Sequence, residues 1–238
     1  MRVVMWSGPR NLSTAMMRSF GARADCDVVD EPFYGAFLHL TGIGHPMREA
    51  VMASMETDWR RVAARCAEDP APGRIRYEKH MTHHMVDGVG LDWMEGAAVA
   101  FLIRDPREVA ASYAVKREMF ELADLGFERQ AELFDAVTEM LGRPPPVIDA
   151  ADVRRDPRRT LSALCAALGI PFDPAMLAWP PGRRESDGVW AAHWYAAVEA
   201  STGFSAPGGP QPSLPPEIAS LIAPASDCHA RLSRHALR

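Results

Sequence analysis

Short apolar runs alternate along the chain with longer stretches whose apolar residues recur at helical spacing. The runs predict five strands, at 3–6, 27–32, 74–81, 97–103 and 145–150. The spaced apolar residues predict helices that begin near 12, lie within 47–67, and span 106–116, 127–141 and 157–169. Strands alternating with helices are typical of a parallel sheet with helices on both faces. We therefore expect an α/β fold, a three-layer sandwich with a central parallel sheet.

The pattern changes in the last third of the chain. A loop at 179–188 precedes a stretch rich in Trp, His and Tyr at 188–204, and 205–216 is dense in Pro and Gly. Spaced apolar residues then predict a terminal helix. We expect an α/β domain over 1–204, a linker or arm over 205–216, and a helix within 217–238 that packs on the same domain.

Composition narrows the possible partners and the location. The 238 residues are 47% hydrophobic and 24% charged, as in ordinary globular enzymes, and the net charge of −5 disfavours nucleic acid. No apolar stretch has the length of a membrane span or the flanks of a signal peptide, so we expect a cytoplasmic protein without stable membrane insertion. The four cysteines are scattered without zinc-ligand spacing, which indicates reduced thiols and no metal site.

The first strand leads into a segment suited to binding an anion. It is followed by a tight turn at 7–11 and a helix beginning near residue 12. A helix N-terminus attracts anions through its free N–H groups and its dipole. Arg10, Ser13 and Thr14 add a positive charge and two hydroxyls. An anion site is therefore predicted in this loop.

This loop does not match the nucleotide-triphosphatase P-loop. Counted from Gly8, the pattern G-x-x-x-x-G-K-[ST] requires Gly and Lys at the positions of Ser13 and Thr14. The apolar strand at 97–103 runs into Arg104, so it does not end in a lone acidic residue for magnesium. A standard ATP site is therefore not expected.

Two motifs resemble those of sulfotransferases that use 3′-phosphoadenosine 5′-phosphosulfate (PAPS). Residues 9–14, Pro-Arg-Asn-Leu-Ser-Thr, resemble the family's 5′-phosphosulfate loop. Residues 103–113 resemble its 3′-phosphate motif, a strand ending in Arg-[Asn/Asp]-Pro before a helix with Ser eight residues after the Arg. Arg104 and Ser112 have that spacing, about 10 Å or more along a helix. The resemblance implies a P-loop-like fold whose nucleotide-binding loop comprises Gly8, Pro9, Arg10, Asn11, Leu12, Ser13 and Thr14.

A third segment resembles the part of the family that folds over the nucleotide. Residues 183–194 contain a basic pair followed by Gly-x-Trp-x-x-His-aromatic. By this resemblance Arg183 and Arg184 contact the 3′-phosphate, and a guanidinium suits bidentate phosphate recognition. The chain departs from the family where Leu12 stands for Gly, Ala15 for a Trp that packs on adenine, and Glu185 for Gly.

Sulfonate transfer also needs a base for the proton of the acceptor hydroxyl. Cytosolic relatives use a His in a Lys-x-His segment, which resembles the segment containing Lys79, His80 and His83. Some bacterial and Golgi relatives use a Glu near the end of the second strand, where this chain has Glu31. Glu31, His80 and, third, His83 are therefore the candidate bases, and Lys79 is expected to touch the sulfonate.

Charge on the leaving phosphate oxygen must be stabilised as well. Arg10, Ser13, Thr14 and the loop amides suit this role. The predicted function is transfer of a sulfonate from PAPS, as co-substrate and without a metal, to a hydroxyl of a small-molecule, carbohydrate or lipid acceptor. The acceptor pocket is expected near 33–59 and 118–129. A P-loop-type kinase of small metabolites and a non-catalytic nucleotide-binding protein on the same fold stay as alternatives.

Overall fold

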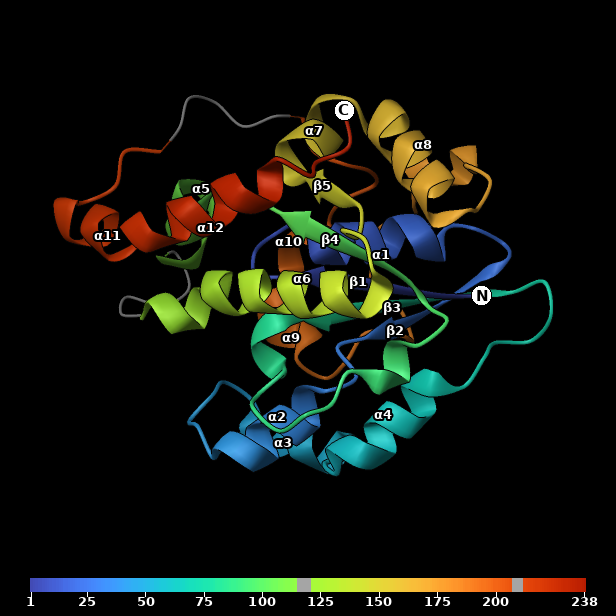
Figure 1. Ribbon diagram of the computed structural model, residues 1–238, viewed down its shortest axis with the longest axis horizontal. Helices are drawn as coiled ribbons and strands as arrows, with labels where there is room; N and C mark the ends of the chain where they lie inside the picture. Colours follow the sequence, from blue (N-terminus) through green and yellow to red (C-terminus); the bar gives the residue numbers. More distant parts are fainter. Residues whose placement is uncertain (115–120, 207–211) are drawn as a thin grey trace.

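A central sheet of five parallel strands organises the molecule (Figure 1). The computed structural model describes residues 1–114, 121–206 and 212–238. The strands are β1 (Arg2–Ser7), β2 (Cys26–Asp30), β3 (Ile75–Met81), β4 (Ala98–Ile103) and β5 (Val147–Asp149), in the order β2-β3-β1-β4-β5. The predicted parallel α/β fold is confirmed. The strand expected to reach residue 32 ends at Asp30, because Glu31 turns to a positive φ of 47°.

Helices connect the strands in sequence. They are α1 (Ser13–Gly21), α2 (Tyr34–Thr41), α3 (Arg48–Ser54), α4 (Trp59–Ala67), α5 (Pro106–Ala114), α6 (Phe127–Leu141), α7 (Ala150–Arg155), α8 (Pro157–Leu168), α9 (Ala191–Trp194), α10 (Ala196–Glu199), α11 (Pro216–Leu221) and α12 (Ala223–Ser233). Short 3-10 turns lie at Thr82–His84, Asp92–Met94, Leu122–Leu125 and Pro174–Leu177. The predicted helix at 106–116 is α5, and its last two predicted positions lie outside the described residues.

Helices α2, α7, α9 and α10 were absent from the sequence-based expectations. Helix α7 follows β5 without a loop, because the Asp149 side chain ends the strand and accepts a hydrogen bond from the Ala151 N–H at 2.8 Å. Helix α8 begins as expected, with Asp156 accepting from the Arg159 N–H at 3.0 Å.

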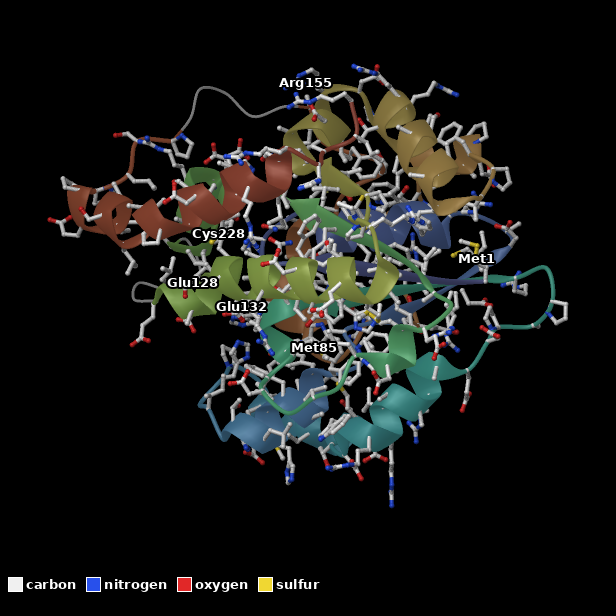
Figure 2. All side chains as sticks on the ribbon, in the orientation of Figure 1. Met1, Met85, Glu128, Glu132, Arg155 and Cys228 are labelled. Carbon is white, nitrogen blue, oxygen red and sulfur yellow. The ribbon has the colours of Figure 1, made fainter. Side chains whose placement is uncertain are left out.

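Side chains from the two faces of the sheet form separate cores. Figure 2 shows the side chains that fill the space between the sheet and the helices. Along β1, Val3 and Met5 face the core made with α1 and α8, whereas Val4 and Trp6 face the core made with α4, α6 and α12. This alternation is the period of two expected of a strand. The helices therefore form a layer on each side of the sheet.

The C-terminal residues pack along α6 and the edge of the sheet. The Arg231 guanidinium on α12 donates to the carbonyl of Ala131 on α6 at 2.7 Å. Leu237 N–H donates to the Val147 carbonyl at 2.8 Å, so the chain end pairs with β5. The expected single terminal helix is instead the pair α11 and α12. Within the expected linker at 205–216, residues 207–211 lie outside the described part of the chain.

The division into domains stays a prediction. Within the ranges that the structure describes, no helix is both long and apolar enough to cross a membrane.

Candidate functional site

A cavity of about 380 Å³ opens at the carboxyl ends of the parallel strands. This edge is where ligands bind in open α/β sheets, and the volume is in the range of small-molecule sites. Ten residues predicted from the sequence line it: Pro9, Arg10, Leu12, Ser13, Thr14, Glu31, Lys79, His83, Arg104 and Ser112. Five predicted residues do not: Gly8, Asn11, His80, Arg183 and Arg184.

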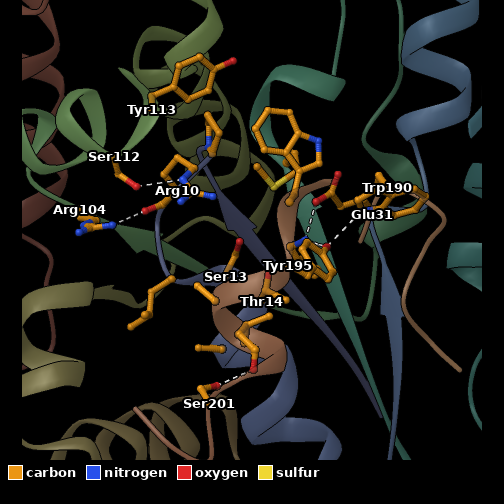
Figure 3. Close-up of a pocket in the computed structure, with 18 of the residues that line it drawn as sticks. Arg10, Ser13, Thr14, Glu31, Arg104, Ser112, Tyr113, Trp190, Tyr195 and Ser201 are labelled. Atoms are coloured by element: carbon orange, nitrogen blue, oxygen red, sulfur yellow. Dashed lines mark hydrogen bonds and ion pairs between the residues drawn. The ribbon is translucent and has the colours of Figure 1, made fainter. Parts of the chain in front are cut away.

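The residues predicted for the nucleotide and the candidate base Glu31 lie on different sides of this cavity. Figure 3 shows Arg10, Arg104 and Ser112 together on one side, and Glu31 on the other. In the same view Ser13, from the first turn of α1, lies between them. The loop after β1 therefore connects a cationic end to an end that contains a carboxylate.

The loop after β1 holds an unusual backbone conformation. Arg10 and Leu12 have φ values of 61° and 69°, in the left-handed region, at a cost of about 1–2 kcal/mol for each residue with a Cβ. Arg104 Nη1 donates to the Arg10 carbonyl at 2.6 Å and helps to hold this shape. Leu12 thus adopts the conformation for which a Gly is best suited, while its side chain packs against the core.

Gly8 and Asn11 support the loop from behind. Asn11 Nδ2 donates to the Leu102 carbonyl on β4 at 3.3 Å. A Cβ on Gly8 would lie 3.0 Å from the Leu125 carbonyl oxygen, so this position has no room for a larger residue. These two residues therefore position the loop and do not face the cavity.

The cationic end is an interlinked group. Arg10 Nε donates to Ser112 Oγ at 3.0 Å, and Arg104 Nε donates to Glu108 Oε2 at 2.9 Å. Arg154, from α7, also lines the cavity, with Nη1 at 3.5 Å from Glu108 Oε2. Burial lowers the pKa of Arg10, and the neighbouring Arg104 charge lowers it further. A bound anion would relieve this repulsion between like charges.

Arg154 was absent from the sequence-based site. Its signal was weak, because Arg154 and Arg155 form a basic pair in an expected strand-to-helix connection without a recognised motif.

At the other end, a buried lysine lies between two carboxylates. Lys79 Nζ donates to Asp30 Oδ1 at 2.9 Å, to Glu31 Oε1 at 2.5 Å and to the Tyr195 hydroxyl at 2.5 Å. Burial acts to lower the pKa of Lys79, but Asp30 and Glu31 hold it well above its ordinary value. Burial raises the pKa of Glu31, against the opposing effect of Lys79, and Asp30 adds to the rise. Glu31 is therefore a stronger base than an exposed glutamate.

Asp30 and Tyr195 were not predicted, and they attach the C-terminal segment to the sheet. The Tyr195 hydroxyl donates to Asp30 Oδ2 at 2.8 Å and accepts from Trp190 Nε1 at 3.1 Å. Gly188 N–H donates to the same Asp30 oxygen at 3.3 Å. Chain separation hid this network, because Asp30 and Tyr195 belong to opposite ends of the sequence.

Two neutral histidines lie near Glu31. Burial lowers the pKa of His83 to about 4, and repulsion from His45 adds to the shift. Burial likewise lowers the pKa of His84 well below its ordinary value. The ring of His84 stacks on Tyr34 with centroids 4.6 Å apart, and its Nε2 lies 3.9 Å from Glu31 Oε2. At neutral pH both rings are uncharged.

His80 lies on the opposite face of the sheet from Lys79. Its Nε2 is 2.9 Å from Glu78 Oε2, and its ring packs against Trp6 and Trp93. Alternation along β3 explains this placement, because adjacent residues point to opposite faces. The expectation that His80 serves as the base is therefore corrected, since its imidazole does not reach the cavity.

His80 also belongs to a buried group with Cys66 and Glu78, whose ligand atoms lie within 4.8 Å of one another. Glu78 in addition accepts from Arg76 Nε at 2.8 Å. The carboxylate is thus already bonded to a guanidinium and an imidazole.

The predicted basic pair also lies away from the cavity. Arg18 makes a buried, two-pronged ion pair with Asp187, at 2.6 Å for each contact, and Asp187 accepts from Arg184 N–H at 2.8 Å. The Arg184 guanidinium donates to nearby backbone carbonyls, including Gly182 at 3.2 Å, and Arg183 is exposed. Local hydrogen bonds therefore hold the Arg184 guanidinium at its own loop, and neither arginine of the pair lines the cavity expected to hold the 3′-phosphate.

Two curated relatives match most of the chain. Branched-chain-amino-acid aminotransferase-like protein 1 of Arabidopsis thaliana is 39% identical over 202 residues, which is 85% of this chain and 36% of that protein. Branched-chain-amino-acid aminotransferase-like protein 2 of the same plant is 37% identical over an equal share. The chain therefore spans about a third of the length of these relatives.

Two solved structures share the fold. The sulfotransferase domain from the curacin biosynthetic pathway aligns over 97% of this chain and 96% of that one, with a TM-score of 0.57 and 18% identity. A sulfotransferase from Alicyclobacillus acidocaldarius aligns over 99% of this chain and 96% of that one, with a TM-score of 0.55 and 12% identity. The family model described as a sulfotransferase domain matches residues 1–226. The chain belongs to the sulfotransferase domain family.

Proposed function

We propose that this domain transfers a sulfonate group from PAPS to an acceptor hydroxyl. The observation that carries the proposal is that one cavity contains both the arginine group and, at its other end, Glu31 and Lys79, with the loop after β1 between them. The residues suit the donor: the arginines and Ser112 match a phosphate, and the start of α1 matches the phosphosulfate. PAPS, when bound, supplies the sulfonate.

The two ends of the cavity have different tasks. Arg104 and Ser112 hold the 3′-phosphate, and this fixes the donor relative to the loop. Arg10, Ser13 and Thr14, with the amides at the start of α1, stabilise the charge that develops on the leaving phosphate oxygen. Their orientation is set before the reaction by the hydrogen bonds from Arg104 and Asn11.

Glu31 is the proposed base. Its carboxylate takes the proton of the acceptor hydroxyl as the acceptor oxygen bonds to sulfur. The bond from sulfur to the bridging phosphate oxygen breaks, and its electron pair stays with the departing 3′-phosphoadenosine 5′-phosphate. Lys79 donates to Glu31 and is close enough to the cavity to touch the sulfonate. His83 is the weaker candidate, because its lowered pKa makes it a poor proton acceptor.

The acceptor enters from the side that carries Tyr34, His45 and Trp194. A small-molecule, carbohydrate or lipid hydroxyl remains the proposed acceptor class, and cytoplasm the proposed location. The aminotransferase-like names belong to proteins of which the chain matches about a third, and they do not direct the proposal.

Calorimetry tests the proposed donor. The wild-type protein should bind 3′-phosphoadenosine 5′-phosphate more tightly than ATP with magnesium. Arg104→Ala should weaken that binding by about tenfold or more, as expected for a lost charge-assisted hydrogen bond. The exposed Arg143 gives the matched control, Arg143→Ala, which should bind like the wild type. Preference for ATP with magnesium would contradict the proposal and support the kinase alternative.

A sulfonation assay tests the base. With labelled PAPS and a library of hydroxyl acceptors, Glu31→Gln should lower turnover by roughly 100-fold or more, with unchanged affinity for 3′-phosphoadenosine 5′-phosphate. His83→Gln should lower it much less. The reverse order would assign the base to His83, and absence of labelled product in the wild type with every acceptor would favour a non-catalytic role.

A further inference from the structure

We propose that Arg154 binds the 3′-phosphate of the nucleotide, the role that the sequence predicted for Arg183 and Arg184. This inference rests on the proposed function. The phosphate clamp then comes from the segments that follow three strands adjacent in the sheet, with Arg10 after β1, Arg104 after β4 and Arg154 after β5. The segment over the cavity would supply aromatic side chains and no cation to this clamp.

The placement of Arg154 follows from the short path between β5 and the cavity. Strand β5 ends at Asp149, which begins α7 directly, so Arg154 lies one helical turn beyond the carboxyl edge of the sheet. Its side chain is only 16% exposed and lines the cavity that also contains Arg104 and Ser112.

Arg154 has unused hydrogen-bonding capacity. Its Nε is buried and has no hydrogen-bond partner among the described residues. A buried donor without a partner destabilises the folded protein by about as much as a lost hydrogen bond contributes. An anion in the cavity would accept this hydrogen bond, whereas an exclusively structural arginine would be expected to have its donors paired.

The local charges fit a phosphate dianion. Glu108 accepts from Arg104 at 2.9 Å and lies 3.5 Å from Arg154, so one carboxylate serves two guanidinium groups. With Arg10, these side chains comprise three positive charges and one negative charge. Burial lowers the pKa of Arg154, and repulsion from Arg104 adds to that shift. A doubly charged anion would neutralise the excess.

Removal of one phosphate from the ligand isolates the contact. Calorimetry should compare 3′-phosphoadenosine 5′-phosphate with adenosine 5′-phosphate, which lacks the 3′-phosphate. Arg154→Gln should weaken binding of the first ligand by about tenfold or more, the range for a hydrogen bond to a charged group, and change the second by less than twofold. Arg154→Lys, which keeps the charge but not the fork, should fall between Gln and the wild type.

Neighbouring arginines provide the controls. Arg155 is on the same helix but pairs with Asp152 at its exposed surface, so Arg155→Gln should bind both ligands as the wild type does. The double variant Arg183→Gln, Arg184→Gln should also keep its affinity. Circular dichroism and thermal melts should establish that each variant is folded.

The outcomes separate the two proposals. If the wild type prefers the ligand with the 3′-phosphate but Arg154→Gln and Arg154→Lys leave that preference unchanged, the role of Arg154 is wrong and the proposed function stands. An equal loss for both ligands would also overturn this role. If the wild type does not distinguish the ligands, the proposed function itself fails, together with this inference.

Discussion

Arg10 Nε donates a hydrogen bond to Ser112 Oγ at 3.0 Å. This contact joins the loop after β1 to helix α5, two segments that the sequence separates widely. Arg104 Nη1 donates in turn to the Arg10 carbonyl at 2.6 Å. The two motifs therefore form one hydrogen-bonded unit, which connects the proposed sites for the two ends of the nucleotide.

Removal of the Ser112 hydroxyl should weaken nucleotide binding modestly. In Ser112→Ala, Arg10 loses a neutral acceptor and the proposed 3′-phosphate loses one donor. A net hydrogen bond contributes about 0.5–1.5 kcal/mol, so affinity for 3′-phosphoadenosine 5′-phosphate should fall roughly 2- to 10-fold in calorimetry. Ser162→Ala, which removes a hydroxyl that donates to the Arg158 carbonyl of its own helix, is the control. Equal affinities in the two variants would show that the Arg10–Ser112 contact is irrelevant to binding.

At Leu12, a Gly substitution should leave the protein more stable than an Ala substitution, which is the reverse of the usual order. With φ at 69°, any residue with a Cβ is strained there, and Gly is not. Leu12→Gly and Leu12→Ala lose almost the same packing, so Leu12→Gly should have the higher free energy of unfolding, by about 1 kcal/mol. Urea unfolding measures the difference. In the middle of α6, the pair Leu133→Gly and Leu133→Ala should show the opposite order.

Loss of the Glu31 charge should stabilise the protein near neutral pH. Burial raises the pKa of Glu31, so the folded protein keeps the carboxyl proton to a higher pH than the unfolded chain does. An unfolded glutamate has a pKa of about 4.3. The proton on Glu31 therefore contributes favourably to the free energy of unfolding below that pH, and this contribution is lost as pH rises through the folded pKa. Wild type and Glu31→Gln should thus have similar free energies of unfolding in acid, and Glu31→Gln should be more stable at neutral pH.

The charges around Glu31 favour the same direction of change in stability. Lys79 lies between Asp30 and Glu31, and Glu31→Gln leaves a balanced pair of one lysine and one carboxylate. Urea unfolding across a pH series measures the effect, with the exposed Glu68→Gln as the control. A growing advantage of the wild type as pH rises would sink this account. Sulfonation by the wild type should increase over the same pH interval, because the base must be ionised.

Gly188 should not tolerate a methyl group. A Cβ there would lie 2.1 Å from Cη2 of Trp190, whose ring is buried and hydrogen-bonded to Tyr195. Gly188→Ala should therefore displace the indole and reduce stability by about 1–3 kcal/mol, which lowers the melting temperature by roughly 2–10 °C. Gly44→Ala, where no described atom beyond the adjacent residues lies within 4 Å of the added Cβ, should melt like the wild type. An unchanged melting temperature for Gly188→Ala would contradict the packing described.

Much of the fold could be predicted because its signals are local. Burial on both faces makes β4 a continuous apolar run, and the caps at Asp156 and Gly169 mark the ends of α8 within a few residues of themselves. The helix after β5 was not predicted, because Asp149 serves both as the last strand residue and as the helix cap. Local patterns do not show where one element replaces another without a loop.

The sequence by itself determined the parallel α/β fold and the strand, turn and helix at its beginning, because strand burial and helix capping depend on residues close together in the chain. Only the tertiary structure decided which side chains share the cavity. It placed Lys79 inside and His80 on the opposite face, joined Asp30 to Tyr195, and brought Arg154 to Arg104 while Arg184 bonded to its own loop. Those relationships depend on which face each layer of helices covers, and that choice is made by packing between distant segments.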